Sequence, residues 1–96
     1  MKLTDYYDLE NLRNTSEELV LDRVGRLLDE RRDICHCEQC VLDLVAYVLN
    51  NVPPYYGTSM LGSLDPNQTR VNVIKGQIEV ALDEGLQRIA RHPNHD

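Results

Sequence analysis

The feature that most constrains this chain is a cluster of three cysteines within six residues, Cys35-His36-Cys37-Glu38-Gln39-Cys40. Thiolates are soft ligands, and three of them at this spacing can reach one ion, so the spacing predicts most of a tetrahedral zinc site. We therefore predict that Cys35, Cys37 and Cys40 are metal ligands and that zinc is the cofactor. A four-cysteine zinc ribbon has a second cysteine pair about 15 to 20 residues further on, whereas this sequence holds three cysteines in all. The fourth ligand must come from elsewhere.

Several groups could supply that fourth ligand. His36 lies inside the cluster, where its two ligating neighbours would strain simultaneous coordination. Asp43 follows Cys40 by three residues, and on a helix it would share that face, either as a ligand or as a carboxylate that orients one. It could equally cap, form an ion pair or face solvent. His92 and His95, water, or a group from a second chain complete the alternatives, although the two histidines also fit a frayed polar end.

Redox thiols are the alternative interpretation of the cluster. A redox Cys-x-x-Cys pair usually has cationic neighbours and a thioredoxin-like sheet, but residues 34–62 contain no Lys or Arg. An iron-sulfur cluster normally needs four cysteines and would here have to bridge two chains. Simple burial of three apolar thiols fits poorly, because His36, Glu38 and Gln39 make the stretch polar.

Two predicted helices flank the cysteine cluster. A capping-box pattern at Thr15 and Glu18 predicts the start of the first, whose apolar residues recur at helical spacing until about Arg32. The second starts in the cluster and runs to about Asn51, before a Pro-Pro pair stops it. Its residues 41–49 are apolar nearly all round. In a chain of this size, such a helix is central or partly covered by a second chain.

A third helix is predicted in the C-terminal part. Asp65 followed by Pro66 is typical of an N-cap and a first helical position, and helical spacing continues to about Arg91. The expected apolar face consists of Val71, Ile74, Ile78, Leu82, Leu86 and Ile89. A helix of about 25 residues is long for so small a domain, which favours packing between two copies. We therefore expect a homodimer.

The remaining segments complete the predicted architecture. Residues 53–65 are rich in Pro, Gly, Ser and Tyr and should form an ordered connection. Residues 1–14 should form a short helix or an arm packed on a neighbour, and residues 1–14 and 92–96 are expected to be peripheral. We find no strand alternation. The predicted fold class is therefore all-α: a single small helical domain over residues 1–96, with the zinc-binding cysteines at the start of its central helix.

Composition excludes several function classes. The chain has 96 residues and neither Phe nor Trp, so its modest core must be aliphatic and would gain from a metal or a partner subunit. A formal net charge of −6 works against binding of nucleic acid or anionic lipid. No apolar run approaches the length that spans a bilayer, and the first residues do not resemble a signal peptide. We therefore expect a cytoplasmic protein with no membrane or direct nucleic-acid partner.

The sequence resembles the ComFB family of late competence development proteins. The resemblance covers about residues 15–85, and its C-x-C-x-x-C pattern joined to an Asn-x-x-Pro-Pro-x-Tyr exit is fairly specific. It rests on Glu18-Leu19-Val20, on residues 35–40 followed by Asp43 and Ala46, and on Leu49-Asn50 with Pro53-Pro54 and Tyr56.

This resemblance implies a small helical, homodimeric, cytosolic protein that binds zinc through the three cysteines and is associated with DNA uptake. It implies no known catalytic activity, so we expect a non-enzymatic regulatory or adaptor protein with an unknown protein partner. Some family members are implicated as receptors for bacterial cyclic dinucleotides, which is the alternative function. A phosphate-rich ligand would bind best at a helix N-terminus with cationic side chains nearby, such as residues 65–67 with Arg70 and Lys75. These two cations could also lie on the solvent-exposed face of the helix without binding a ligand.

A zinc hydrolase is a candidate from another class. It would need an open metal position and a general base, and Glu38 is the one carboxylate inside the cluster. Sulfur-rich ligation donates charge to the metal and weakens it as a Lewis acid. We therefore expect no enzymatic activity and no catalytic residues.

Overall fold

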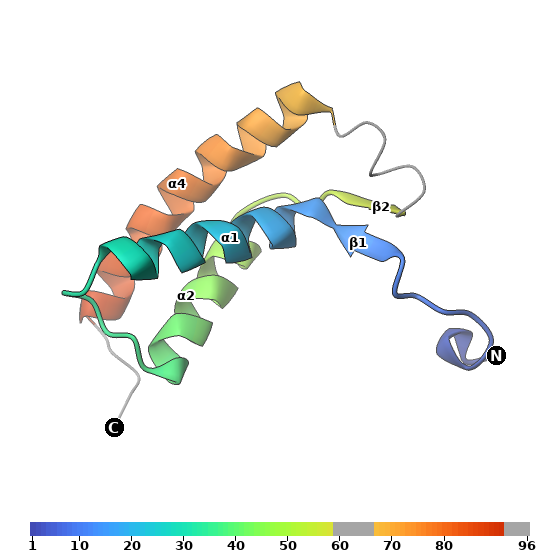
Figure 1. Cartoon of the computed structure of the whole chain (residues 1–96), viewed down its shortest axis with the longest axis horizontal. Helices are drawn as coiled ribbons and strands as arrows, with labels where there is room; N and C mark the ends of the chain where they lie inside the picture. Colours follow the sequence, from blue (N-terminus) through green and yellow to red (C-terminus); the bar gives the residue numbers. More distant parts are fainter. Residues whose placement is uncertain (59–66, 92–96) are drawn as a thin grey trace.

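The computed structural model describes residues 1–58 and 67–91. Its main elements are the helices α1 (Thr15–Glu30), α2 (Glu38–Asn50) and α4 (Gln68–Arg91). Two short strands, β1 (Leu12–Asn14) and β2 (Tyr56–Thr58), pair at one end of the helices, and a single 3-10 turn (Leu3–Asp5) lies near the N-terminus. Figure 1 shows the helices gathered on one side, while the N-terminal residues extend away from them beyond β1. The described chain is thus mostly helical with a small sheet.

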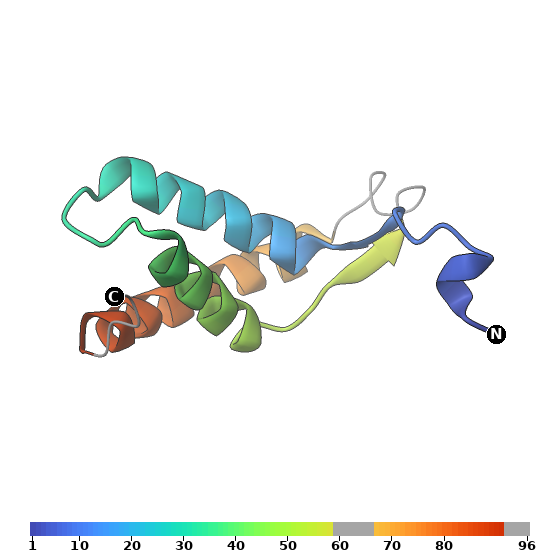
Figure 2. The same ribbon diagram turned by 90° about the horizontal axis from the view of Figure 1, so that it is seen from below.

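An aliphatic core joins the three helices, as the composition predicts. Figure 2 shows α1 lying on one side of α2 and α4, with α2 next to the C-terminal half of α4. Each fully buried Val, Leu or Ile side chain contributes about 1.5 to 3 kcal/mol relative to exposure. The residues of this core are Val20, Val24 and Leu27 of α1, Leu44 and Val48 of α2, Val52, and Ile74, Ile78, Ala81 and Leu82 of α4.

The predicted apolar face of α4 is covered within the chain. Ile74, Ile78 and Leu82 are buried in the core, and Leu86 and Ile89 are half-buried against it. The homodimer stays a prediction, and this face does not support it, because α1 and α2 cover it within the chain. Asp65 and Pro66, the predicted start of the helix, lie outside the described residues; within them, Asn67 Oδ1 accepts a hydrogen bond from Arg70 N at 3.1 Å.

The prediction of an all-α fold is wrong in one respect, because β1 and β2 form an antiparallel pair. Leu12 lies opposite Thr58, and Asn14 lies opposite Tyr56. Each strand has only three residues and neither has a buried face, so no alternation marks them in the sequence. Contacts between residues distant in sequence create this pairing, including the hydrogen bond from Thr15 N to Tyr55 O at 2.7 Å.

The capping box predicted at Thr15 and Glu18 is also wrong. Asn14 is the N-cap of α1, and its Oδ1 accepts hydrogen bonds from Ser16 N at 3.1 Å and from Tyr55 N at 2.9 Å. Glu18 instead pairs with Arg13 at 3.1 Å. Asn is as good an N-cap as Thr, and here its side chain also ties the start of α1 to the segment that follows α2.

Gly85 permits the close approach of α2 and α4. A Cβ atom at Gly85 would lie 2.9 Å from Leu44 Cδ1 and 3.0 Å from Tyr47 Cδ1, whereas one at Gly25 on α1 would meet nothing within 4 Å. Neither glycine has a positive φ. We predict that Gly25→Ala raises the free energy of unfolding by about 0.5–1 kcal/mol. Gly85→Ala should lower it by about 1–2 kcal/mol, because overpacking exceeds the same gain in helix propensity.

Urea denaturation of the two variants checks this prediction. Opposite changes in stability are expected for the same chemical substitution in two helices. If Gly85→Ala were as stabilising as Gly25→Ala, α2 and α4 would not approach as closely as described.

Candidate metal centre

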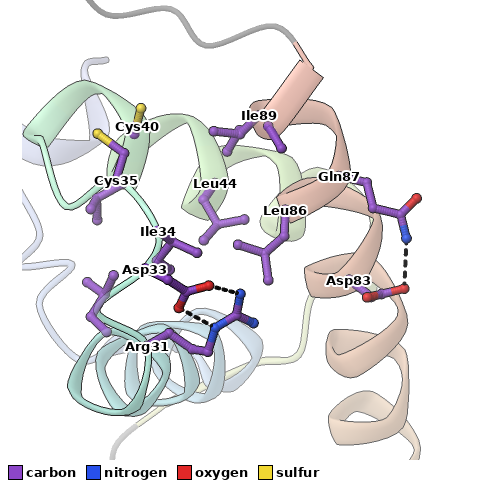
Figure 3. Close-up of a pocket in the computed structure, with 13 residues that line it drawn as sticks. Arg31, Asp33, Ile34, Cys35, Cys40, Leu44, Asp83, Leu86, Gln87 and Ile89 are labelled. Carbon is purple, nitrogen blue, oxygen red and sulfur yellow. Dashed lines mark hydrogen bonds and ion pairs between the residues drawn. The ribbon is translucent and has the colours of Figure 1, made fainter.

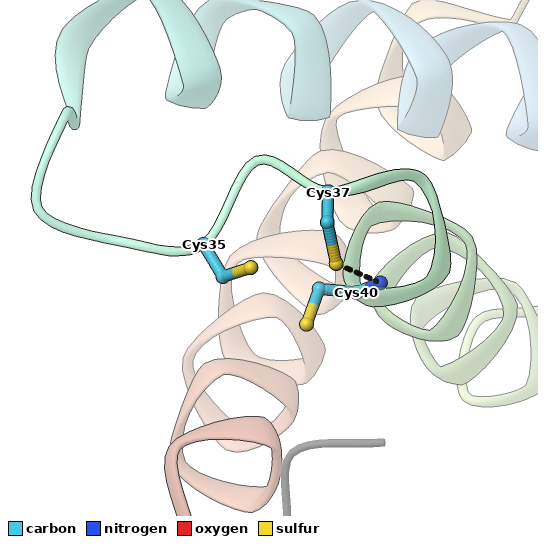
Figure 4. Close-up of side chains that lie close together, drawn as sticks. All are labelled: Cys35, Cys37 and Cys40. Carbon is cyan, nitrogen blue, oxygen red and sulfur yellow. Dashed lines mark hydrogen bonds between the residues drawn. The ribbon is translucent and has the colours of Figure 1, made fainter. Parts of the chain in front are cut away.

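The three cysteines lie where the connection after α1 enters α2. The extended backbone of Cys37, with φ −65° and ψ 152°, makes this residue the N-cap of α2, and its Sγ accepts a hydrogen bond from Cys40 N at 3.4 Å. Cys40 sits in the first turn, so the helix brings Cys37 and Cys40 to one side. Cys35 approaches from the connection (Figure 4). Local helix geometry thus explains why Cys37 and Cys40 converge, and the path of the connection brings Cys35 to them.

The sulfur atoms are close enough to share a metal. All three Sγ atoms lie within 4.8 Å of one another. Two sulfurs bound to one tetrahedral zinc at about 2.3 Å are about 3.8 Å apart, so small side-chain movements would bring the three into a coordination shell. Cys35 and Cys37 are exposed and Cys40 is buried. The donor set therefore fits a soft divalent ion, and zinc fits three thiolates well.

The environment of Cys40 favours its neutral form in the absence of a cation. Burial, together with hydrogen bonds with Cys37 and Cys35, raises the pKa of the Cys40 thiol to about 12. A bound metal ion reverses this preference, because a coordinating thiol loses its proton. Metal binding at this site would therefore release a proton and strengthen as the pH rises.

The predicted fourth ligands are not gathered with the cysteines. His36 Nε2 lies 2.7 Å from Arg31 O, and Asp43 Oδ1 accepts a hydrogen bond from Gln39 Nε2 at 2.8 Å. Within residues 1–58 and 67–91, the group that could hold a metal here consists of the three cysteines alone. His92 and His95 lie outside the described residues. Water and a second chain also remain as sources of the fourth ligand.

A cavity of about 530 Å³ opens beside the cysteines. Cys35 and Cys40 line it on one side, and Leu86 and Ile89 of α4 line it on the other (Figure 3). This arrangement has no local signal in the sequence, because the last turns of α4 are more than 40 residues from the cluster. The C-terminal end of α4 thus borders the candidate metal centre.

An ion pair closes one side of this cavity. Arg31 and Asp33 are joined by two hydrogen bonds of 2.7 Å. The hydrogen bonding from the Arg31 guanidinium lowers the pKa of the Asp33 carboxyl to about 2. Both groups therefore stay charged at neutral pH, and their opposite charges cancel. The pair adds no net charge to this side of the cavity.

The residues predicted for nucleotide binding or for hydrolysis do not line this cavity. Arg70 lies 4.2 Å above the Tyr55 ring and donates to Pro54 O at 3.3 Å. Lys75 lines a groove whose other charged residues include the Arg23–Glu79 ion pair. Glu38 is exposed at the first position of α2.

The comparisons with known proteins identify one family. Residues 13–93 match the model of a family described as late competence development protein ComFB. No curated protein matches the chain. Among the described residues, no helix is both long and apolar enough to span a membrane.

Substitution of Cys37 separates capping from metal ligation. Serine is one of the best N-cap residues, but its hydroxyl is a poor zinc ligand. We predict that Cys37→Ser keeps the metal-free protein at least as stable as the metal-free parent and abolishes the rise in melting temperature that zinc produces. Cys37→Ala should lose the metal response and also about 1 kcal/mol of cap stability. Thermal unfolding with and without zinc measures both effects.

The three cysteines offer matched controls for this experiment. Cys35→Ser removes a ligand that is not an N-cap. It should therefore reduce the rise in melting temperature that zinc produces, while leaving the melting temperature of the metal-free protein nearly unaltered. A full zinc response in Cys37→Ser would show that Cys37 is not a ligand.

Proposed function

The chain belongs to the ComFB family, and from this relationship and the cysteine geometry we propose that it is a non-enzymatic, zinc-binding regulatory or adaptor protein of late competence. The observation that carries the proposal is the convergence of three sulfur atoms within 4.8 Å at the start of α2. The family supports the association with competence. The zinc identity rests on the thiol donor set.

The position of the cluster supports a structural role for the metal. Cys35 belongs to the connection between α1 and α2, while Cys37 and Cys40 belong to the start of α2. Cys35 and Cys40 also line the cavity that Leu86 and Ile89 of α4 share. A metal bound there joins the connection to the helix, and its binding free energy adds to folding free energy. The scaffold then presents its outer surface to a partner.

Catalysis is not part of the proposal. Glu38 is the carboxylate nearest to the cysteines in sequence, and its side chain extends from an exposed helical position. Three thiolate donors weaken zinc as a Lewis acid, and a hydrolase also needs a base within hydrogen-bond reach of a bound water. A partner-binding role needs neither.

Elemental analysis and activity assays test this function together. We expect about one zinc per chain after reconstitution, a lower melting temperature after complete chelation, and no hydrolysis of phosphoester or peptide substrates by the zinc-loaded protein. Protein that remains metal-free with three titratable thiols would contradict the zinc role. Turnover that Glu38→Gln abolishes would contradict the non-enzymatic role.

A homodimer belongs to the same proposal, but the buried face of α4 does not support it. The support comes from the opposite face, where Val73 is 56% exposed and Val80 is 62% exposed. These two residues lie two turns apart, and Gly76 and Gln77 between them line a shallow cavity with them. A second copy that packs here would cover both valines.

Aspartate substitutions at Val80 and Leu82 of α4 distinguish a residue of the proposed dimer interface from a residue of the core. Val80→Asp should lower the sedimentation-derived mass to that of a monomer while leaving the helical circular dichroism unchanged. Leu82 is 3% exposed, so Leu82→Asp should unfold the protein, because it buries an unpaired charge. A parent protein that sediments as a monomer at micromolar concentration would contradict the dimer.

A cyclic dinucleotide receptor is the alternative function. Within the described residues, Arg70 already contacts Tyr55 and Pro54. The groove of Lys75 holds three cations and three carboxylates, and two of each form the ion pairs Arg23–Glu79 and Arg26–Asp22. These contacts give a phosphate less free positive charge than the two cations suggest from sequence. Calorimetry with cyclic dinucleotides tests this alternative. Binding that weakens in Arg70→Ala and at high salt would favour it, and the absence of heat at high ligand concentration would exclude it.

A further inference from the structure

We infer that Cys37 and Cys40 form a redox modification site, in which a hydroperoxide oxidises the two thiols to a disulfide and so releases the metal. This inference rests on the proposed zinc site, because it assigns a regulation to the same sulfur atoms. It concerns the pair within the cluster, not the cluster as a whole.

The geometry of the pair supports a disulfide. Cys37 and Cys40 occupy the N-cap and the first turn of α2, and the hydrogen bonds Cys40 N to Cys37 Sγ at 3.4 Å and Val41 N to Cys37 O at 3.0 Å close that turn. Residues three apart in a helical turn have Cα separations within the usual disulfide range of about 4.4–6.8 Å. The Sγ atoms already lie within 4.8 Å. Closure requires rotation of side chains and little movement of the backbone.

Accessibility gives the two cysteines different roles. Cys37 is exposed and Cys40 is buried. A hydroperoxide in solution therefore meets Cys37 first, whereas Cys40 is protected from direct oxidation and can attack an oxidised Cys37 from inside the turn. An exposed sulfur at a helix N-terminus followed by a buried sulfur three residues later is an arrangement in which thiol reactivity is commonly enhanced.

The alternative pair of Cys35 and Cys37 is less favourable. Residues 35 and 36 form neither a turn nor a bend. Two residues separated by one intervening residue along a nearly straight stretch have Cα atoms about 6.6–7.2 Å apart, at or beyond the upper limit for a disulfide. The helix start therefore favours Cys40 over Cys35 as the partner of Cys37.

The chemical step balances with hydrogen peroxide as the oxidant. The Cys37 sulfur attacks one peroxide oxygen, the O–O bond breaks, and a sulfenic acid and water form. The Cys40 sulfur then attacks the Cys37 sulfur, an S–S bond forms, the S–O bond breaks, and a second water leaves. In the zinc-loaded protein the two sulfurs start as thiolates, so solvent supplies the two protons that metal binding released. Two thiols and one peroxide thus give one disulfide and two waters. The sulfurs lose two electrons and the peroxide gains them.

Loss of two donors removes the metal and loosens the scaffold. A disulfide leaves Cys35 as the one remaining thiol of the chain, and a single thiol holds zinc weakly. The Cys37 sulfur also becomes a poorer acceptor for Cys40 N. Oxidation would therefore release zinc and destabilise the start of α2 together, so the partner-binding scaffold responds to peroxide.

Hydrogen peroxide treatment of the zinc-loaded, full-length protein tests the inference. We expect loss of two thiols and release of one zinc per chain in parallel, a Cys37–Cys40 disulfide in the peptide map, and recovery of both thiols and zinc after dithiothreitol and added zinc. A map that links Cys35 to either cysteine would overturn the inference. Retention of all three thiols, under conditions that oxidise a linear peptide of residues 33–42, would also overturn it.

Two variants and a metal-free sample sharpen the test. Cys35→Ser should still form the disulfide, whereas Cys40→Ser should stop at a Cys37 sulfenic acid that dimedone traps. An intrachain disulfide in Cys40→Ser would argue against the assignment. The same mapping on metal-free protein separates the two proposals: a chain that never binds zinc but forms the Cys37–Cys40 disulfide refutes the metal function and supports the thiol pair.

Discussion

The rest of the structure depends on the aliphatic contact between α4 and the pair formed by α1 and α2. The chain has no Phe or Trp, so Val, Leu and Ile side chains must fill the core. Ile74, Ile78 and Val48 are almost completely inaccessible, and Gly85 lets α4 approach α2 without a side chain between them. This packing places the end of α1 and the start of α2 beside the C-terminal turns of α4. It therefore also sets where the cysteines lie relative to the end of α4.

Polar contacts hold the opposite end of the same helices. Ser16 is 1% exposed, and its Oγ donates a hydrogen bond to Pro53 O. Asn14 accepts from Ser16 N and Tyr55 N, so the start of α1 and the segment after α2 are joined. A metal at the cysteines would fix the other end, where α1 leads into α2. The helix pair is then constrained at both ends, which suits a small domain with a modest core.

The helices were predictable because each has a local signal. Helical spacing of apolar residues located α1, α2 and α4, and C-x-C-x-x-C spacing located three sulfur atoms that the structure brings within 4.8 Å. The features that sequence could not reveal depend on distant contacts. Asn14 replaces Thr15 as the N-cap because Tyr55 also contacts it, and the cavity exists because Leu86 and Ile89 lie beside Cys40. The strands were not predictable for the same reason, because β1 and β2 pair across more than 40 residues of sequence.

X-ray absorption at the zinc edge tests the central claim, that three cysteines of one chain hold one zinc ion, most directly. We predict a coordination shell with three sulfurs at about 2.3 Å and one nitrogen or oxygen at about 2.0–2.1 Å. A shell of nitrogen and oxygen alone would show that the cysteines are not the ligands. Four sulfurs would contradict a one-chain site, because the fourth could come only from another chain with the same three cysteines.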